Sequence, residues 1–210
     1  MTRSFIIVGL TIAAASYVWA DELQPNIPEA ASQLVAQSKE LRLNQHDIKA
    51  AEAILKDVVA KYPDYYKAHY NLGLVYQDKN DYDAAIHELE QAKAIREAQD
   101  LAEYSIYNTL GWVYMQKGDT KGAEGYYLTA LHYESKNTPD SNTRLYNNLA
   151  WYYYNLGKPD EAKKYLDVAE QKYQSKSAGD LKKLVDQLAV DKQKIKVKVE
   201  SYSGKRSQPK

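Results

Sequence analysis

The chain has 210 residues with 28 basic and 28 acidic side chains, so its formal net charge is zero. Such a balance argues against a protein that binds nucleic acid or anionic lipid mainly by bulk electrostatics. The chain has no cysteine, which excludes a disulfide scaffold, a thiol nucleophile, a Cys-ligated metal site and a lipid anchored on cysteine. The length allows one domain, or two small ones, that can fold unaided.

The N-terminal segment has the residue order of a secretory signal peptide. Arg3 precedes an apolar run from Phe5 to Val18, and Ala20 is a small residue just before the polar Asp21. This run is shorter than the ~20 residues that span a membrane, so a retained anchor is the less favoured alternative. We therefore expect residues 1–20 to be a cleaved signal peptide, residues 21–30 to be a flexible lead, and the protein to be exported to a bacterial periplasm or secreted.

The rest of the chain contains an internal repeat. Three segments align without gaps around Gly73, Gly111 and Ala150, which lie 38 and 39 residues apart. In each segment a tyrosine follows this glycine or alanine by three positions. A turn residue, a small residue, a large residue and a second small residue then follow at distances that match between the segments. In order, these positions are Tyr76, Tyr114 and Tyr153; Asn80, Gly118 and Gly157; Ala85, Ala123 and Ala162; Leu89, Tyr127 and Leu166; Ala92, Ala130 and Ala169.

This pattern resembles the tetratricopeptide repeat family, whose helix–turn–helix unit has small residues where helices approach and large residues beside them. The resemblance implies an all-α, right-handed α-solenoid of about four hairpins. We expect a degenerate repeat at 31–65, with one extra residue in its turn, and clear repeats at 66–103, 104–142 and 143–176. These units exceed the usual length of the repeat, so we expect longer second helices or inter-repeat loops, the clearest loop being Ser135–Asp140.

The C-terminal region divides into two parts. Apolar residues at helical spacing predict a capping helix at 177–191 over the end of the stack. Residues 192–210 are rich in lysine and arginine, and we expect a basic flexible tail that could touch an acidic surface. The alternation of lysine with apolar residues at 194–199 could instead pair as a strand with a partner.

The sequence offers little that would support catalysis, a metal or a cofactor. His87-Glu88-Leu89-Glu90-Gln91 approaches the zinc-protease pattern, but Gln91 stands where the second histidine ligand is required. No nucleophile elbow, Walker loop or dinucleotide fingerprint occurs. We therefore expect no enzyme, cofactor or metal. The Lys, Asn and Arg cluster with which chaperone-binding relatives hold a C-terminal carboxylate is not predicted either.

The resemblance places one face of each first helix in a concave groove. The residues predicted to line it are Tyr70, Leu74, Gln77, Asn108, Trp112, Met115, Asn147, Trp151 and Tyr154. Amphipathic aromatics and amides suit an extended peptide or a sugar face. We therefore expect an exported scaffold that binds an extended peptide or partner protein in this groove. The alternatives are a module for glycan or peptidoglycan, and a structural protein that self-associates.

Overall fold

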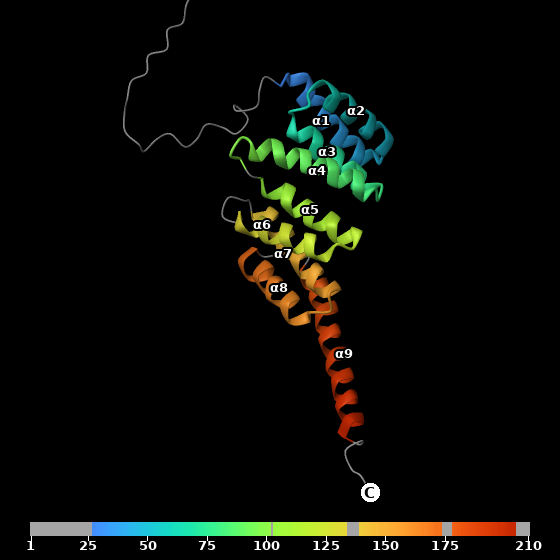
Figure 1. Cartoon of the computed structure of the whole chain (residues 1–210), viewed down its shortest axis with the longest axis vertical. Helices are drawn as coiled ribbons and strands as arrows, with labels where there is room; N and C mark the ends of the chain where they lie inside the picture. The colour runs from blue at the N-terminus through green and yellow to red at the C-terminus, as the bar shows by residue number, and fades with distance from the viewer. Residues whose placement is uncertain (1–26, 102, 134–138, 174–177, 205–210) are drawn as a thin grey trace, which may run out of the picture.

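The computed structural model describes residues 27–101, 103–133, 139–173 and 178–204. The predicted signal peptide and most of the predicted lead lie outside these ranges. Within them the regular secondary structure is entirely helical (Figure 1). The elements are α1 (Glu29–Glu40), η1 (Leu41–Gln45), α2 (Ile48–Lys61), α3 (Tyr66–Asp78), α4 (Tyr82–Glu97), α5 (Tyr104–Lys117), α6 (Thr120–His132), α7 (Pro139–Asn155), α8 (Pro159–Tyr173) and α9 (Ala178–Gly204).

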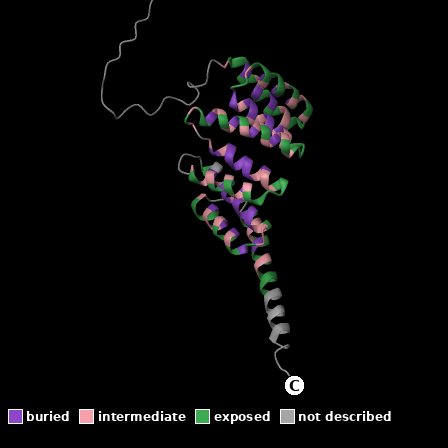
Figure 2. Ribbon diagram, in the orientation of Figure 1, coloured by how far each residue is buried: buried purple, intermediate pink, exposed green. Residues whose placement is uncertain are grey.

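The helices form a stack of hairpins. The pairs α1/α2, α3/α4, α5/α6 and α7/α8 follow one another along the molecule, and α9 packs on the last pair and projects beyond it (Figure 1). Buried residues lie between the layers, while the outer faces are exposed (Figure 2). This arrangement confirms the predicted all-α solenoid. Within the described ranges, no helix combines the length and the apolar character needed to cross a bilayer.

The turns inside the hairpins form where the repeat predicts them. Asn80, Gly118 and Gly157 all have positive φ, at 59°, 89° and 66°. Asn and Gly adopt this left-handed conformation at the lowest cost, and it reverses the chain after the first helix of each pair. Aspartate then caps two of the following helices: the Asp81 carboxylate accepts from the Ala84 N–H, and the Asp119 carboxylate accepts from the Gly122 N–H.

Close packing inside the hairpins depends on glycine, as predicted. A Cβ atom added at Gly73 would lie 2.7 Å from Leu89 Cγ, and one added at Gly111 would lie 2.7 Å from Tyr127 Cδ1. Both distances are far below ordinary van der Waals contact. Glycine at these two positions therefore lets the two helices of each hairpin approach each other.

Tyrosine fills the core of the C-terminal half. The Tyr127 side chain is fully buried and meets the Tyr152 ring edge-on, at 5.8 Å between centroids. The Tyr152 hydroxyl donates to the Thr120 carbonyl at 3.0 Å, whereas the Tyr127 hydroxyl is buried with no hydrogen-bond partner in the described part of the chain. The predicted packing role of Tyr127 is confirmed, and its hydroxyl remains unsatisfied.

A buried histidine joins α3 to α4 and to the turn before α3. The Nδ1 atom of His69 lies 2.7 Å from a Glu88 carboxylate oxygen, and Nε2 lies 2.9 Å from the Pro63 carbonyl oxygen. Both partners are acceptors, so the geometry suits an imidazolium that donates from both nitrogens. Burial lowers the His69 pKa, but the hydrogen bonds to Glu88 and Pro63 outweigh it, and the pKa is raised above its ordinary value.

The first hairpin has the extra residue that was predicted for its turn, but the structure holds this residue in a helix. The chain winds into the π-helical segment η1 directly after α1. A π turn holds one more residue than an α turn, so the insertion is absorbed within the helix. His46, with φ of 54°, then takes the place that Asn80 and Gly118 take in the later hairpins.

Two expectations at the C-terminal end differ from the structure. The predicted loop Ser135–Asp140 ends earlier, because α7 begins at Pro139, and proline suits a first helical turn; residues 134–138 lie outside the described ranges. Helix α9 does not end at 191 but continues to Gly204, so the predicted flexible tail is helical over 192–204. No proline or glycine interrupts this stretch, and Lys, Gln and Glu favour helix.

Candidate functional site

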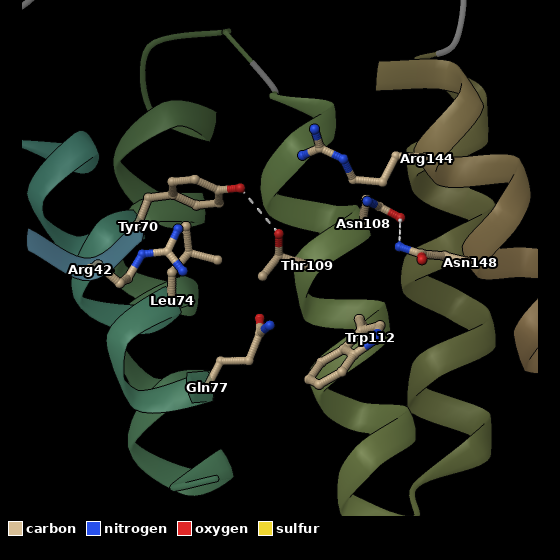
Figure 3. A pocket seen from close by; sticks show the side chains of 9 residues that line it. All are labelled: Arg42, Tyr70, Leu74, Gln77, Asn108, Thr109, Trp112, Arg144 and Asn148. Atoms are coloured by element: carbon tan, nitrogen blue, oxygen red, sulfur yellow. Dashed lines mark hydrogen bonds between the residues drawn. The ribbon is translucent and has the colours of Figure 1, made fainter. Parts of the chain in front are cut away.

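The first helices of the middle hairpins enclose a pocket of about 280 Å³, here called the central pocket (Figure 3). Its lining comes from η1, α3, α5 and α7, and on α3 and α7 the lining side chains lie one helical turn apart. The nine lining residues are Arg42, Tyr70, Leu74, Gln77, Asn108, Thr109, Trp112, Arg144 and Asn148. Trp112 and Leu74 supply apolar surface, and most of the other groups are hydrogen-bond donors or acceptors.

An amide pair bridges α5 and α7 at one side of the pocket. The Asn148 side-chain N–H donates to the Asn108 Oδ1 atom at 3.1 Å (Figure 3). The remaining amide groups, Asn108 Nδ2 and Asn148 Oδ1, make no hydrogen bond to the described residues. Together they present one donor and one acceptor, which is the complement of a peptide group.

A pair of hydroxyls links α3 to α5 across the pocket. Thr109 donates its single hydroxyl proton to the Ser105 carbonyl at 2.8 Å. The 3.2 Å contact between Tyr70 and Thr109 must therefore be a hydrogen bond donated by the Tyr70 hydroxyl (Figure 3). This bond holds the Tyr70 ring against α5.

Two lining residues carry buried polar atoms that have no hydrogen-bond partner among the described residues. They are the Nε donor of Arg42 and the Oε1 acceptor of Gln77. A buried polar group without a partner costs about 1–3 kcal/mol, and such groups in native proteins call for an explanation. Both atoms belong to residues that line the pocket, and both are closed off from solvent in this structure.

The charge of the pocket lining is positive. Arg42 and Arg144 are its only charged members, and none of the nine side chains is a carboxylate, an imidazole or a thiol. Arg42 pairs with the carboxylate of Asp78 at 2.9 Å, and Asp78 is not one of the nine lining residues. Burial raises the pKa of the nearby Tyr104, while the positive charge of Arg144 acts in the opposite direction. Among the nine lining side chains, Tyr70 is therefore the one group of the kinds that transfer protons in acid–base catalysis.

The structure brings together five of the nine residues predicted for the groove: Tyr70, Leu74, Gln77, Asn108 and Trp112. The other four, Met115, Asn147, Trp151 and Tyr154, do not line the central pocket. Trp151 stacks on Tyr154 at 5.4 Å and is 38 % exposed. Among the described residues, no group of three or more His, Cys, Asp or Glu is placed to hold a metal ion.

Four lining residues were missed by the sequence reasoning. Thr109, Arg144 and Asn148 lie on the side of α5 or α7 that faces the preceding first helix, whereas the prediction took the side that faces the following one. Thr109 and Asn148 occupy the same column of the repeat alignment, but the alignment alone does not tell which of two adjacent columns faces the preceding helix. Arg42 lies in η1, where the inserted residue shifts the alignment of the first repeat.

Comparison with known families identifies the repeats. Residues 64–132 match one model of the tetratricopeptide repeat, and residues 143–174 match another. These two stretches are therefore tetratricopeptide repeats, as the spacing of small and large residues predicted. No curated protein matches the chain.

Solved structures with the same fold include proteins of different kinds. The Pseudomonas aeruginosa protein pilF is 18 % identical, with a TM-score of 0.66 over 79 % of this chain and 70 % of that one. MamA is 24 % identical, with a TM-score of 0.57 over 75 % of this chain and 86 % of its own. The O-GlcNAc transferase of Thermobaculum terrenum is 22 % identical, with a TM-score of 0.58 over 69 % of this chain but 26 % of the transferase. At these identities the likeness concerns the fold alone.

Proposed function

We propose that this chain of tetratricopeptide repeats is a non-enzymatic scaffold that binds an extended peptide segment of a partner protein in the central pocket. The observation that carries the proposal is the set of hydrogen-bonding groups left open around the pocket. At the amide pair, Asn108 Nδ2 is a donor and Asn148 Oδ1 is an acceptor. An extended backbone offers N–H and carbonyl groups in alternation, so one segment can satisfy both kinds.

The size and the rigidity of the pocket support a short segment. A volume of about 280 Å³ lies at the lower end of the ~300–1,000 Å³ of small-molecule sites. An extended chain advances about 3.3 Å per residue, so a few residues cross the lining from α3 to α7. Because the lining residues stand on packed helices, the pocket is largely preformed, which lowers the entropic cost of binding.

The proposal includes export of the protein. The N-terminal order of Arg3, a 14-residue apolar run and a small residue at Ala20 supports a signal peptide. The partner would then be met in a bacterial periplasm or outside the cell. Mass spectrometry of the protein purified from its own cells tests this part, because cleavage predicts that Asp21 is the first residue.

Trp112 and Trp151 form a matched pair for testing the pocket. The full-length protein is immobilised, peptides are selected from a random dodecapeptide phage library, and their affinities are measured by fluorescence polarisation. Trp112 lines the pocket, so Trp112→Ala should weaken the selected peptides by about tenfold or more. Trp151 lies outside it, so Trp151→Ala should leave their affinity unchanged.

Circular dichroism establishes that both variants are folded. Equal affinities for folded Trp112→Ala and the unchanged protein would contradict the assignment of the pocket. Failure to select any peptide would contradict peptide binding itself.

A further inference from the structure

The two arginines that line the central pocket differ in whether a carboxylate neutralises their charge. Arg42 is 13 % exposed in its side chain, and its Nη1 atom donates to the Asp78 carboxylate at 2.9 Å. Arg144 is exposed, and it forms no ion pair with the described residues. The pocket therefore has one guanidinium that is already neutralised and one that is not.

Arg144 stands beside the amide pair. It precedes Asn148 by four residues on α7, so the two side chains lie one turn apart on the same face, and both point into the pocket (Figure 3). A peptide group bound by Asn108 and Asn148 therefore has its neighbouring side chain within reach of the guanidinium. Arginine presents a planar fork of donors that matches a carboxylate in two parallel hydrogen bonds.

We propose that the segment bound in the central pocket carries an aspartate or glutamate side chain that pairs with Arg144, so that the preferred partner is an acidic peptide. The inference rests on the proposed function, and it names the chemical class of the ligand. The absence of any carboxylate among the nine lining residues favours an anion on electrostatic grounds.

An acidic side chain within the segment fits better than the carboxylate at a chain end. Tyr70, Leu74 and Gln77 line the pocket from α3, and Arg144 lines it from α7 (Figure 3). A segment that contacts both sides must run across the pocket with backbone on both sides of the amide pair. A terminal carboxylate at Arg144 would be satisfied without this crossing.

The test uses a dodecapeptide library displayed with fixed linkers at both ends, so that no library residue is a chain end. We expect the peptides selected on the full-length protein to be enriched in Asp and Glu over the unselected library. One selected peptide is then synthesised with blocked termini, and each acid is exchanged in turn for its amide. Exchange of the pairing acid should weaken binding about fivefold, the scale of an exposed ion pair, and the effect should shrink as salt increases.

Variants of the protein complete a double-mutant cycle. In Arg144→Gln the same exchange of the pairing acid should have no effect, because its partner is gone. In Lys163→Gln, a control on the exposed face of α8, the fivefold effect should persist.

Each other outcome overturns the inference. Pocket-dependent peptides without an excess of acids would refute the acidic preference while leaving peptide binding intact. An acid requirement that persists in Arg144→Gln would place the carboxylate elsewhere. Failure to select any peptide would refute the proposed function and this inference with it.

Discussion

Replacing one glycine by alanine in each helix of the third hairpin should have opposite effects on stability. Gly111 lies on α5 against the Tyr127 ring, and Gly125 lies on α6 with nothing within 4 Å of an added Cβ. In Gly111→Ala the new methyl group would lie 2.7 Å from Tyr127 Cδ1 and 2.8 Å from Cε1, where about 3.5–4.0 Å is needed. The ring has no room to move, because it is fully buried and its edge meets Tyr152.

The expected magnitudes follow from two opposing terms. Overpacking a core costs about 1–3 kcal/mol, while glycine in a helix interior is about 1 kcal/mol worse than alanine. Since an aromatic ring cannot bend away, the first term should be near its upper end, and Gly111→Ala should lose about 1–2 kcal/mol. Gly125→Ala has no steric term and should gain about 0.5–1 kcal/mol.

Urea unfolding followed by circular dichroism measures both changes. With a slope of about 2 kcal/mol per molar urea, Gly111→Ala should lower the midpoint by roughly 0.5–1 M, and Gly125→Ala should raise it. A Gly111→Ala variant as stable as Gly125→Ala would refute the claim that glycine sets the helix separation in this hairpin.

Two further predictions concern buried polar groups. Tyr127→Phe removes a buried hydroxyl without a partner and should stabilise the protein by about 1 kcal/mol, whereas Tyr152→Phe removes a satisfied one and should destabilise it by a similar amount in the same urea assay. His69 has a raised pKa in the folded state, so it binds more protons there than in the unfolded chain. Its contribution to stability should be complete below about pH 6.5, the unfolded value, and should be lost as the pH rises through the folded pKa. The unfolding midpoint of the unchanged protein should therefore fall over this pH range, and that of His69→Gln should not show this fall. The same pH profile in both proteins would contradict the pairing of His69 with Glu88 and Pro63.

The fold could be predicted from the sequence because the repeat encodes steric requirements. Gly73 and Gly111 recur where two helices touch, and the large residue that each one meets, Leu89 or Tyr127, recurs at a constant distance. Such contacts are local to a hairpin, so one chain segment contains both partners. The π-helical segment after α1 could not be predicted, because an inserted residue fits equally well in the turn or in the helix.

The pocket was only partly predictable, because it is built between helices of different repeats. Asn108 and Trp112 were found from the columns of the alignment, since they face the next helix as the family pattern implies. Arg144 and Asn148 depend on how α7 is rotated against α5, and the repeat does not specify which of two adjacent columns faces backward. That Arg42 Nε and Gln77 Oε1 are buried without a hydrogen-bond partner among the described residues can be seen only in the three-dimensional structure.

The proposed binding site for a peptide is the pocket between α3, α5 and α7. The most direct test is site-specific photo-crosslinking in the full-length protein, with p-benzoylphenylalanine at Leu74 inside the pocket or at Leu128, which is 47 % exposed on α6. We expect a library-selected peptide to crosslink through position 74 and not through position 128. Crosslinking through position 128 alone, or equally through both, would contradict it.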